Sequence, residues 1–108
     1  MVRQVETLDD FNAILKEAGD KLVVVDFTAS WCGPCKQIGP HFEELSNKAE
    51  NKNVIFLKVD VDDAQEVAAE WEIRAMPTFI FLKNGEKVME VVGADRVKLG
   101  KNLGELRT

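Results

Sequence analysis

The chain has 108 residues, 45% of them hydrophobic, which suits one compact domain with its own core, spanning residues 1–108. Its net charge is −5 at pH 7, and residues 60–72 carry six carboxylates without a lysine or arginine, so nucleic-acid phosphates would be repelled. No apolar stretch approaches the roughly 18 residues that a membrane helix needs, and no secretory signal is visible. We therefore expect a soluble, cytoplasmic protein that binds neither nucleic acid nor membrane.

The first half of the chain predicts alternating strands and helices. Residues 3–6 are a short strand candidate. A helix should follow the capping residue Thr7 and end at Gly19, because apolar side chains recur at helical spacing between them. Residues 22–28 are β-branched and almost continuously apolar, which is typical of a central parallel strand covered on both faces, and residues 53–60 repeat that character.

Two further helices are expected around the second of these strands. One should begin near Pro34, since proline is tolerated in a first helical turn, and Pro40 should kink it. Its apolar stripe would consist of Ile38, Phe42, Leu45 and Ala49. Asp63, with Glu66 three residues later, resembles a capping box and predicts a short helix that carries Val67, Ala68 and Trp71.

The last third of the chain has a different pattern. Residues 78–83 and 87–92 flank Asn84-Gly85, a strong hairpin signal, so these two strands should be antiparallel. A final helix from about Asp95 would carry Leu99, Leu103 and Leu106. The whole order predicts an α/β fold with a central mixed five-stranded sheet flanked by four helices. Ligand sites in such sheets lie at the carboxyl ends of strands.

Two cysteines lie at that edge, just after the strand of residues 22–28. Cys32 would sit at the N-terminal end of the second helix, where unpaired N–H groups and the helix dipole stabilise an anion by up to about 2 kcal/mol. Cys32 is therefore the candidate for an attacking thiolate. Cys35, nearly one turn later, can reach the sulfur of Cys32 and displace a bound substrate from it in an intramolecular step. The pair predicts thiol–disulfide exchange.

Three other uses of the cysteine pair fit the sequence less well. A zinc site wants four ligands, but the chain has one CxxC and one histidine, His41. A purely structural disulfide closing a loop of about four residues would restrain the unfolded chain by only about 2 kcal/mol. A cysteine hydrolase needs a nearby base, and His41 falls on the opposite side of the helix from Cys32.

Asp26 places a carboxylate inside the apolar strand that precedes the cysteines. An isolated buried charge is costly, so Asp26 should have a raised pKa or a partner, for which Lys58 in the neighbouring strand is the candidate. The alternative is that both side chains reach solvent at the ends of their strands. If Asp26 is buried, it could accept the proton of Cys35, which we expect to be more shielded than Cys32.

Three stretches carry a resemblance to a known family. They are "WCGPCK" at residues 31–36, preceded by "VVVDF", then "AMPTF" at residues 75–79 and "VVGA" at residues 91–94. In their order and spacing the chain resembles the thioredoxins over essentially its whole length, which implies the thioredoxin fold. The resemblance is to the eukaryotic cytosolic type, because Thr28 stands where bacterial members usually have tryptophan.

This resemblance implies a role for each matching residue. Cys32 would attack and Cys35 would resolve, with Asp26 and Lys58 as the buried pair that tunes them. Met76-Pro77 would form a cis-proline loop against the sulfurs, and the backbone of Met76 would pair with an extended substrate. The surface that binds substrate would consist of Trp31, Gly33, Pro34, Met76, Pro77, Gly93 and Ala94.

The expected function is that of a monomeric oxidoreductase that reduces protein disulfides through the Cys32–Cys35 dithiol. It would hold no cofactor or metal, and a thioredoxin reductase would recharge it with electrons from NADPH. A rival function with the same chemistry is that of an oxidant or isomerase. Two features argue against it: the Gly-Pro between the cysteines and the lack of a secretory signal. A rival of another class is a scaffold or binding subunit in which the cysteines are dispensable.

Overall fold

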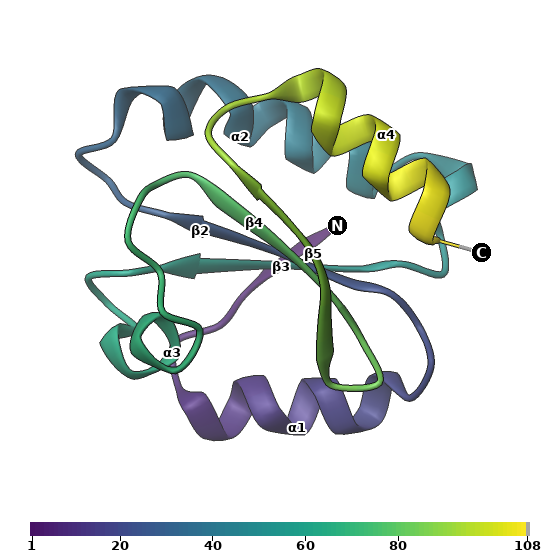
Figure 1. Ribbon diagram of the computed structural model, residues 1–108, viewed down its shortest axis with the longest axis horizontal. Helices are drawn as coiled ribbons and strands as arrows, with labels where there is room; N and C mark the ends of the chain where they lie inside the picture. The colour runs from purple at the N-terminus through teal and green to yellow at the C-terminus, as the bar shows by residue number, and fades with distance from the viewer. Residues whose placement is uncertain (108) are drawn as a thin grey trace.

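The computed structural model describes residues 1–107, and in this range five strands and four α-helices follow the expected order (Figure 1). Helices cover both faces of the sheet, with α2 and α4 on one face and α1 and α3 on the other (Figure 1). The elements are β1 (Val2–Gln4), α1 (Leu8–Ala18), β2 (Val23–Thr28), α2 (Gly33–Ser46), the 3₁₀ turn η1 (Ala49–Asn51), β3 (Ile55–Asp60), α3 (Gln65–Glu70), β4 (Thr78–Lys83), β5 (Glu86–Val92) and α4 (Arg96–Leu106).

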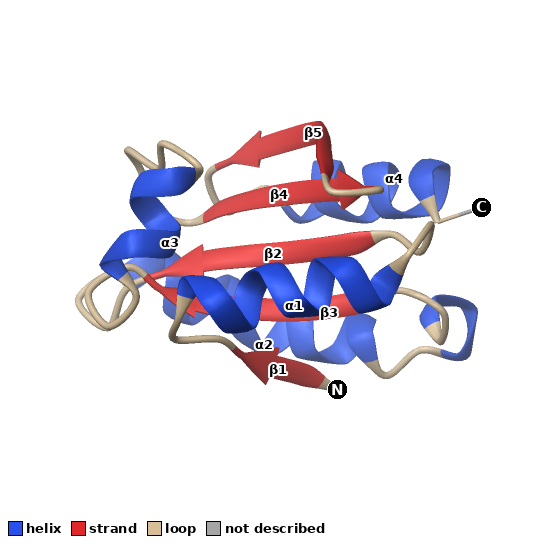
Figure 2. Cartoon of the chain, turned by 90° about the horizontal axis from the view of Figure 1, so that it is seen from below, coloured by secondary structure: helices blue, strands red, loops and turns tan. Residues whose placement is uncertain are grey.

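The strand order across the sheet is β1-β3-β2-β4-β5, so the most apolar strand is central. β2 pairs in parallel with β3 and antiparallel with β4, and all six of its residues are buried. The carboxyl ends of β1, β2, β3 and β5 meet at one edge of the sheet, where β4 begins (Figure 2). Segments that follow β2 and β5 are thereby brought beside the segment that precedes β4.

Alternation along the strands separates two apolar cores. Val23, Val25 and Phe27 of β2 face α1 and α3, whereas Val24 faces α2 and α4. On the second face, Phe42 of α2 packs against aromatic rings of the sheet, with ring centroids 5.2 Å from Phe56 and 5.4 Å from Phe79. Burying each such ring contributes about 2–3 kcal/mol, so this contact fixes α2 on the sheet.

Several local signals read from the sequence are confirmed. Thr7 Oγ1 accepts a hydrogen bond from the Asp10 N–H at 3.1 Å and caps α1. Asp95 Oδ1 accepts from the Lys98 N–H at 3.0 Å and caps α4. In the β4–β5 hairpin, Asn84-Gly85 has φ of 54° and 77°, the left-handed conformation that a tight hairpin turn requires.

Other expectations about the elements are wrong in detail. β1 begins at Val2 and ends at Gln4, instead of running over residues 3–6. α2 ends at Ser46, and Ala49 lies exposed in η1 instead of on the apolar stripe of α2. α3 is capped by Ala64 without a side-chain hydrogen bond, so the Asp63 capping box does not form. Trp71 follows α3 and packs against the ring of Phe11, with centroids 6.0 Å apart.

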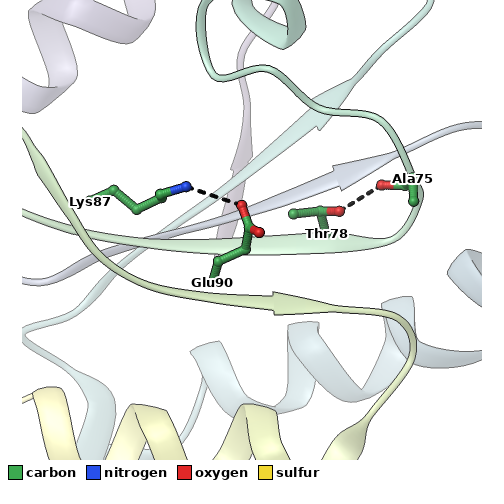
Figure 3. Close-up of polar contacts among 4 residues, drawn as sticks. All are labelled: Ala75, Thr78, Lys87 and Glu90. Atoms are coloured by element: carbon green, nitrogen blue, oxygen red, sulfur yellow. Dashed lines mark hydrogen bonds and ion pairs between the residues drawn. The ribbon is translucent and has the colours of Figure 1, made fainter.

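A β-bulge in β5 brings Lys87 and Glu90 to the same face of the edge strand. Lys87 pairs with Leu82 and Glu90 with Ile80, two residues of the α1 and α3 core, because the register shifts between Phe81 and Leu82. The Lys87 Nζ and Glu90 Oε1 atoms form an ion pair at 3.2 Å (Figure 3). Such an exposed pair contributes under about 1 kcal/mol, but charges on an edge strand discourage pairing with another chain.

Candidate active site

The disulfide Cys32–Cys35 lies at the N-terminal end of α2, directly after β2 and its short connecting loop. Cys32 is the N-cap residue of this helix, and its Sγ accepts a hydrogen bond from the Cys35 N–H at 3.2 Å. The sulfur thus occupies the position in which a serine or aspartate oxygen usually caps a helix. Once the disulfide is reduced, this N–H and the helix dipole favour negative charge on Cys32 Sγ.

The two cysteines are almost equally buried, with 5% of Cys32 and 4% of Cys35 exposed. The disulfide form thus shows almost no difference in burial, and the expectation that the Cys35 thiol is the more shielded one in the reduced protein stays a prediction. Both sulfurs lie in a small apolar cluster, onto which Val61 and Met76 pack from neighbouring segments. The two sulfurs differ in their surroundings, because Cys35 alone of the pair lines a cavity that also reaches Asp26.

The Met76-Pro77 segment packs against Cys32, as the resemblance implies. The Met76–Pro77 peptide bond is cis, and the Met76 carbonyl oxygen lies 3.7 Å from Cys32 Sγ. Two hydrogen bonds anchor the segment: Thr78 Oγ1 donates to the Ala75 carbonyl at 2.6 Å (Figure 3), and the Gly93 N–H donates to the Pro77 carbonyl at 2.8 Å. The start of β4 and the end of β5 thus hold this segment beside the sulfur.

The remaining residues of the predicted substrate surface lie around this contact. Trp31 precedes Cys32 and is 66% exposed. Gly93 has φ of 99°, a conformation that side chains other than glycine rarely adopt. The other members differ in exposure: Gly33, Pro34 and Ala94 are exposed, Met76 is partly buried and Pro77 is buried.

Asp62 is a site residue that the sequence analysis missed. Its Oδ2 accepts a hydrogen bond from Trp31 Nε1 at 2.9 Å, which holds the exposed indole at the edge of the disulfide. Asp62 belongs to the acidic run of residues 60–72, and such runs are ordinarily solvated surface. The available signal was that this run begins at the end of β3, which pairs with the end of β2, and that Trp31 follows β2 in the next loop.

Asp26 is buried behind the disulfide, with only 3% of its surface exposed. Within residues 1–107 its Oδ1 has no hydrogen-bond partner. Burial raises the pKa of Asp26 from 3.8 to about 7, and the positive charge of Lys58 opposes this rise with a smaller effect. The carboxyl group is therefore half protonated near neutral pH, so it can accept or release a proton there.

Lys58 is not the buried partner that we expected. It stands opposite Asp26 in the parallel pairing of β2 and β3, yet its side chain is exposed and the two residues form no ion pair within the described chain. The physical reason is that β3 lies one strand nearer the sheet edge, where a long lysine stem reaches water. The sequence left open whether both side chains are buried or both reach solvent. The structure shows that Asp26 is buried and that Lys58 reaches solvent.

Two further observations concern metal ligands and membrane-spanning helices. Across residues 1–107, no three or more histidine, cysteine, aspartate or glutamate side chains are grouped so that they could hold a metal ion. No helix in this part of the chain combines the length and apolar composition needed to cross a membrane. The disulfide and the buried Asp26 offer the chemistry of two adjacent sulfurs and of a carboxyl group with a raised pKa.

Comparison with known proteins gives a consistent result. A family model described as Thioredoxin matches residues 2–105. Among curated proteins, the thioredoxin of Homo sapiens is 57% identical over 98% of this chain and 99% of its own length, and that of Ictalurus punctatus is 55% identical over 97% and 98%. Among solved structures, Malassezia sympodialis thioredoxin superposes with a TM-score of 0.93 at 48% identity, covering 99% of this chain and 94% of that one. Fasciola hepatica thioredoxin gives a TM-score of 0.92 at 41% identity, covering 96% and 98%.

Proposed function

The chain belongs to the thioredoxin family and is a dithiol–disulfide oxidoreductase, and we propose that its own residues reduce protein disulfides in the following way. In the reduced protein, the thiolate of Cys32 attacks one sulfur of the substrate disulfide. The substrate S–S bond breaks, and its other sulfur leaves as a thiolate with the electron pair. The product of this step is a mixed disulfide between Cys32 and the substrate.

Cys35 completes the reaction. Its thiolate attacks Cys32 Sγ, the mixed disulfide breaks, and the second substrate sulfur leaves as a thiolate. The Cys32–Cys35 disulfide forms, so the protein loses the two electrons that the substrate gains. The Cys35 N–H donates a hydrogen bond to Cys32 Sγ, with 3.2 Å between nitrogen and sulfur. This contact supports Cys35 as the resolving residue, because it places Cys35 within one helical turn of the sulfur that it must attack.

Asp26 accepts the proton that Cys35 must lose before this second attack. Three observations support the role: the carboxyl group is buried, it shares a cavity with Cys35, and its pKa is raised to about 7. A base with a pKa near the working pH is both ionised often enough to accept the proton and basic enough to hold it. Lys58 tunes this group from the solvent side, since its charge lowers the pKa of Asp26.

The substrate lies across the surface around Cys32. An extended segment pairs with the backbone of Met76 and contacts the exposed face of Trp31, while Gly33, Pro34, Pro77, Gly93 and Ala94 border it. The hydrogen bonds that hold Pro77 to Gly93 and Trp31 to Asp62 support this role, because they fix both sides of the surface before a substrate arrives.

A thioredoxin reductase returns the disulfide to the dithiol with electrons from NADPH, and the protein acts as a cytoplasmic monomer in this electron transport. Membership of the thioredoxin family supports the reductase as partner. With this partner the protein itself needs no bound cofactor, since the exchange uses only the sulfurs of Cys32 and Cys35.

The observation that carries this function is the N-cap position of Cys32, with Cys35 bonded to it. Reduction of insulin by dithiothreitol tests the function. We expect the wild-type chain at micromolar concentration to accelerate insulin precipitation well above the reagent blank. The double variant Cys32→Ser, Cys35→Ser should match the blank. A wild-type rate equal to the blank would refute the reductase function and favour the scaffold alternative, in which the double variant keeps its binding partners.

A further inference from the structure

A cavity of about 720 Å³ opens between α2 and the strands β1, β2 and β3. Asp26 and Lys58 contribute to its wall from the sheet, and Lys36 and Glu43 from the helix. Of the residues assigned to the substrate surface, none lines it. The cavity meets the active site through Cys35, Asp26 and Lys58 and not through the substrate surface, so a molecule inside it would not occupy the place of a protein substrate.

The cavity lies between a row of polar side chains on the sheet and a glycine of the helix, which has no side chain to fill the space. Gln4, Lys58 and Asp26 are register partners on three adjacent strands, so they lie side by side. On α2, Gly39 follows Cys35 by one turn and shares its face. A Cβ at Gly39 would meet no atom within 4 Å, which confirms that the space before it is open.

The groups around the cavity leave one oxygen of the Asp26 carboxyl group without a hydrogen-bond partner in the described part of the chain. With Asp26 ionised, the wall carries three carboxylates, Asp26, Glu43 and Asp60, against two ammonium groups, Lys36 and Lys58, for a net charge of −1. Asp60 Oδ1 already accepts the Asp62 N–H at 2.9 Å. Asp26, in contrast, is 3% exposed, its Oδ1 lacks a partner within residues 1–107, and it forms no ion pair with Lys58. A buried carboxylate oxygen without a hydrogen-bond partner carries a free-energy cost, so a ligand that donates hydrogen bonds to it is bound more favourably.

We propose that this cavity binds a small planar organic cation of the amidinium or guanidinium class, which donates N–H groups to Asp26 and rests its apolar part against Pro40 and Phe42. A planar fork of donors matches a carboxylate, and such a cation is more weakly hydrated than an ammonium group, so it enters a partly apolar space at lower cost. The volume lies in the range of small-molecule sites. Anions are disfavoured by the net charge of the wall.

Nuclear magnetic resonance titration of the oxidised full chain tests this site. Benzamidine is the probe, and the neutral benzamide and the anionic benzoate are matched in size and shape. We expect saturable shifts of the backbone amides of Gln4, Gly39 and Lys58 with benzamidine. Benzamide should bind at least tenfold more weakly. Because the pKa of Asp26 is about 7, its ionised fraction rises about tenfold from pH 6 to pH 8, and benzamidine affinity should rise by about the same factor.

Two variants separate the proposed contact from a general charge effect. Asp26→Asn keeps the shape of the side chain but removes its charge, so benzamidine should bind it no better than benzamide does, without dependence on pH in this range. Glu44→Gln removes one carboxylate from the same helix outside the cavity, and its affinity should stay within twofold of wild type. The proposal is wrong if benzamidine gives no saturable shifts, if Asp26→Asn binds it as tightly as wild type, or if the shifts centre on Met76 and Gly93.

Discussion

Replacing Asp26 with asparagine should stabilise the protein, by an amount that depends on pH. The unfolded chain binds the Asp26 proton with a pKa of 3.8, and burial raises this pKa to about 7 in the folded chain. Between these values the folded state holds the proton and the unfolded state does not. The free energy of unfolding therefore falls as pH rises, by about 1.4 kcal/mol per pH unit, and the loss levels off above pH 7. The total loss, which asparagine avoids, is roughly 4 kcal/mol.

Urea denaturation of the oxidised wild-type and Asp26→Asn chains measures this difference. We expect nearly equal midpoints close to pH 4, a growing advantage of the variant between pH 5 and pH 7, and a constant advantage above pH 8. The comparison between variants cancels groups that titrate alike in both. Glu44→Gln, which changes an exposed carboxylate of α2, serves as the control and should shift stability by under about 0.5 kcal/mol at every pH. A difference between wild type and Asp26→Asn that does not vary with pH would refute the claim that this carboxyl group is buried and protonated.

The remaining predictions concern the exchange reaction. Asp26→Asn should slow resolution of a preformed mixed disulfide by roughly 10²-fold in single-turnover experiments, and an unchanged rate would remove the proton-acceptor role. Lys58→Met should raise the pKa of Asp26 further, seen as a shift of the pH dependence of resolution to higher pH; a shift to lower pH would contradict it. Asp62→Ala should raise KM for a protein disulfide about 2- to 10-fold through loss of the Trp31 hydrogen bond, with kcat little changed, and an unaltered KM would show that this bond does not matter for docking. Gly93→Ala should cost about 1–3 kcal/mol in urea denaturation, because φ of 99° strains any side chain, and no loss would mean that the segment adjusts freely.

The fold was largely predictable because its signals are local. Thr7 and Asp95 each cap a helix through their own side chains, and Asn84-Gly85 adopts the turn that its conformational freedom favours. Signals that depend on competing partners were less dependable. Asp63 had the spacing of a capping residue, but α3 begins without a side-chain cap. The residue at which a helix such as α3 begins depends on how neighbouring elements pack. The spacing of residues in the sequence does not contain this information.

The site was predictable in its chemistry and less so in its surroundings. The position of Cys32 follows from the end of an apolar strand and from Pro34 in the next helical turn. The exposure of Lys58 depends on where β3 lies in the sheet, and strand order is a tertiary property. The Trp31–Asp62 hydrogen bond joins residues 31 positions apart on different loops, so no local sequence pattern predicted it. Burial of both sulfurs likewise depends on Val61 and Met76, which arrive from distant segments.

The central claim is that Cys32 attacks and Cys35 resolves, and trapping of the mixed disulfide tests it most directly. Each single serine variant in its reduced form is mixed with a protein disulfide, and the covalent products are measured by mass spectrometry under non-reducing conditions. The account predicts that Cys35→Ser accumulates a stable adduct linked through Cys32, while Cys32→Ser forms almost none. An adduct that accumulates on Cys35 in the Cys32→Ser variant at a comparable rate would contradict it.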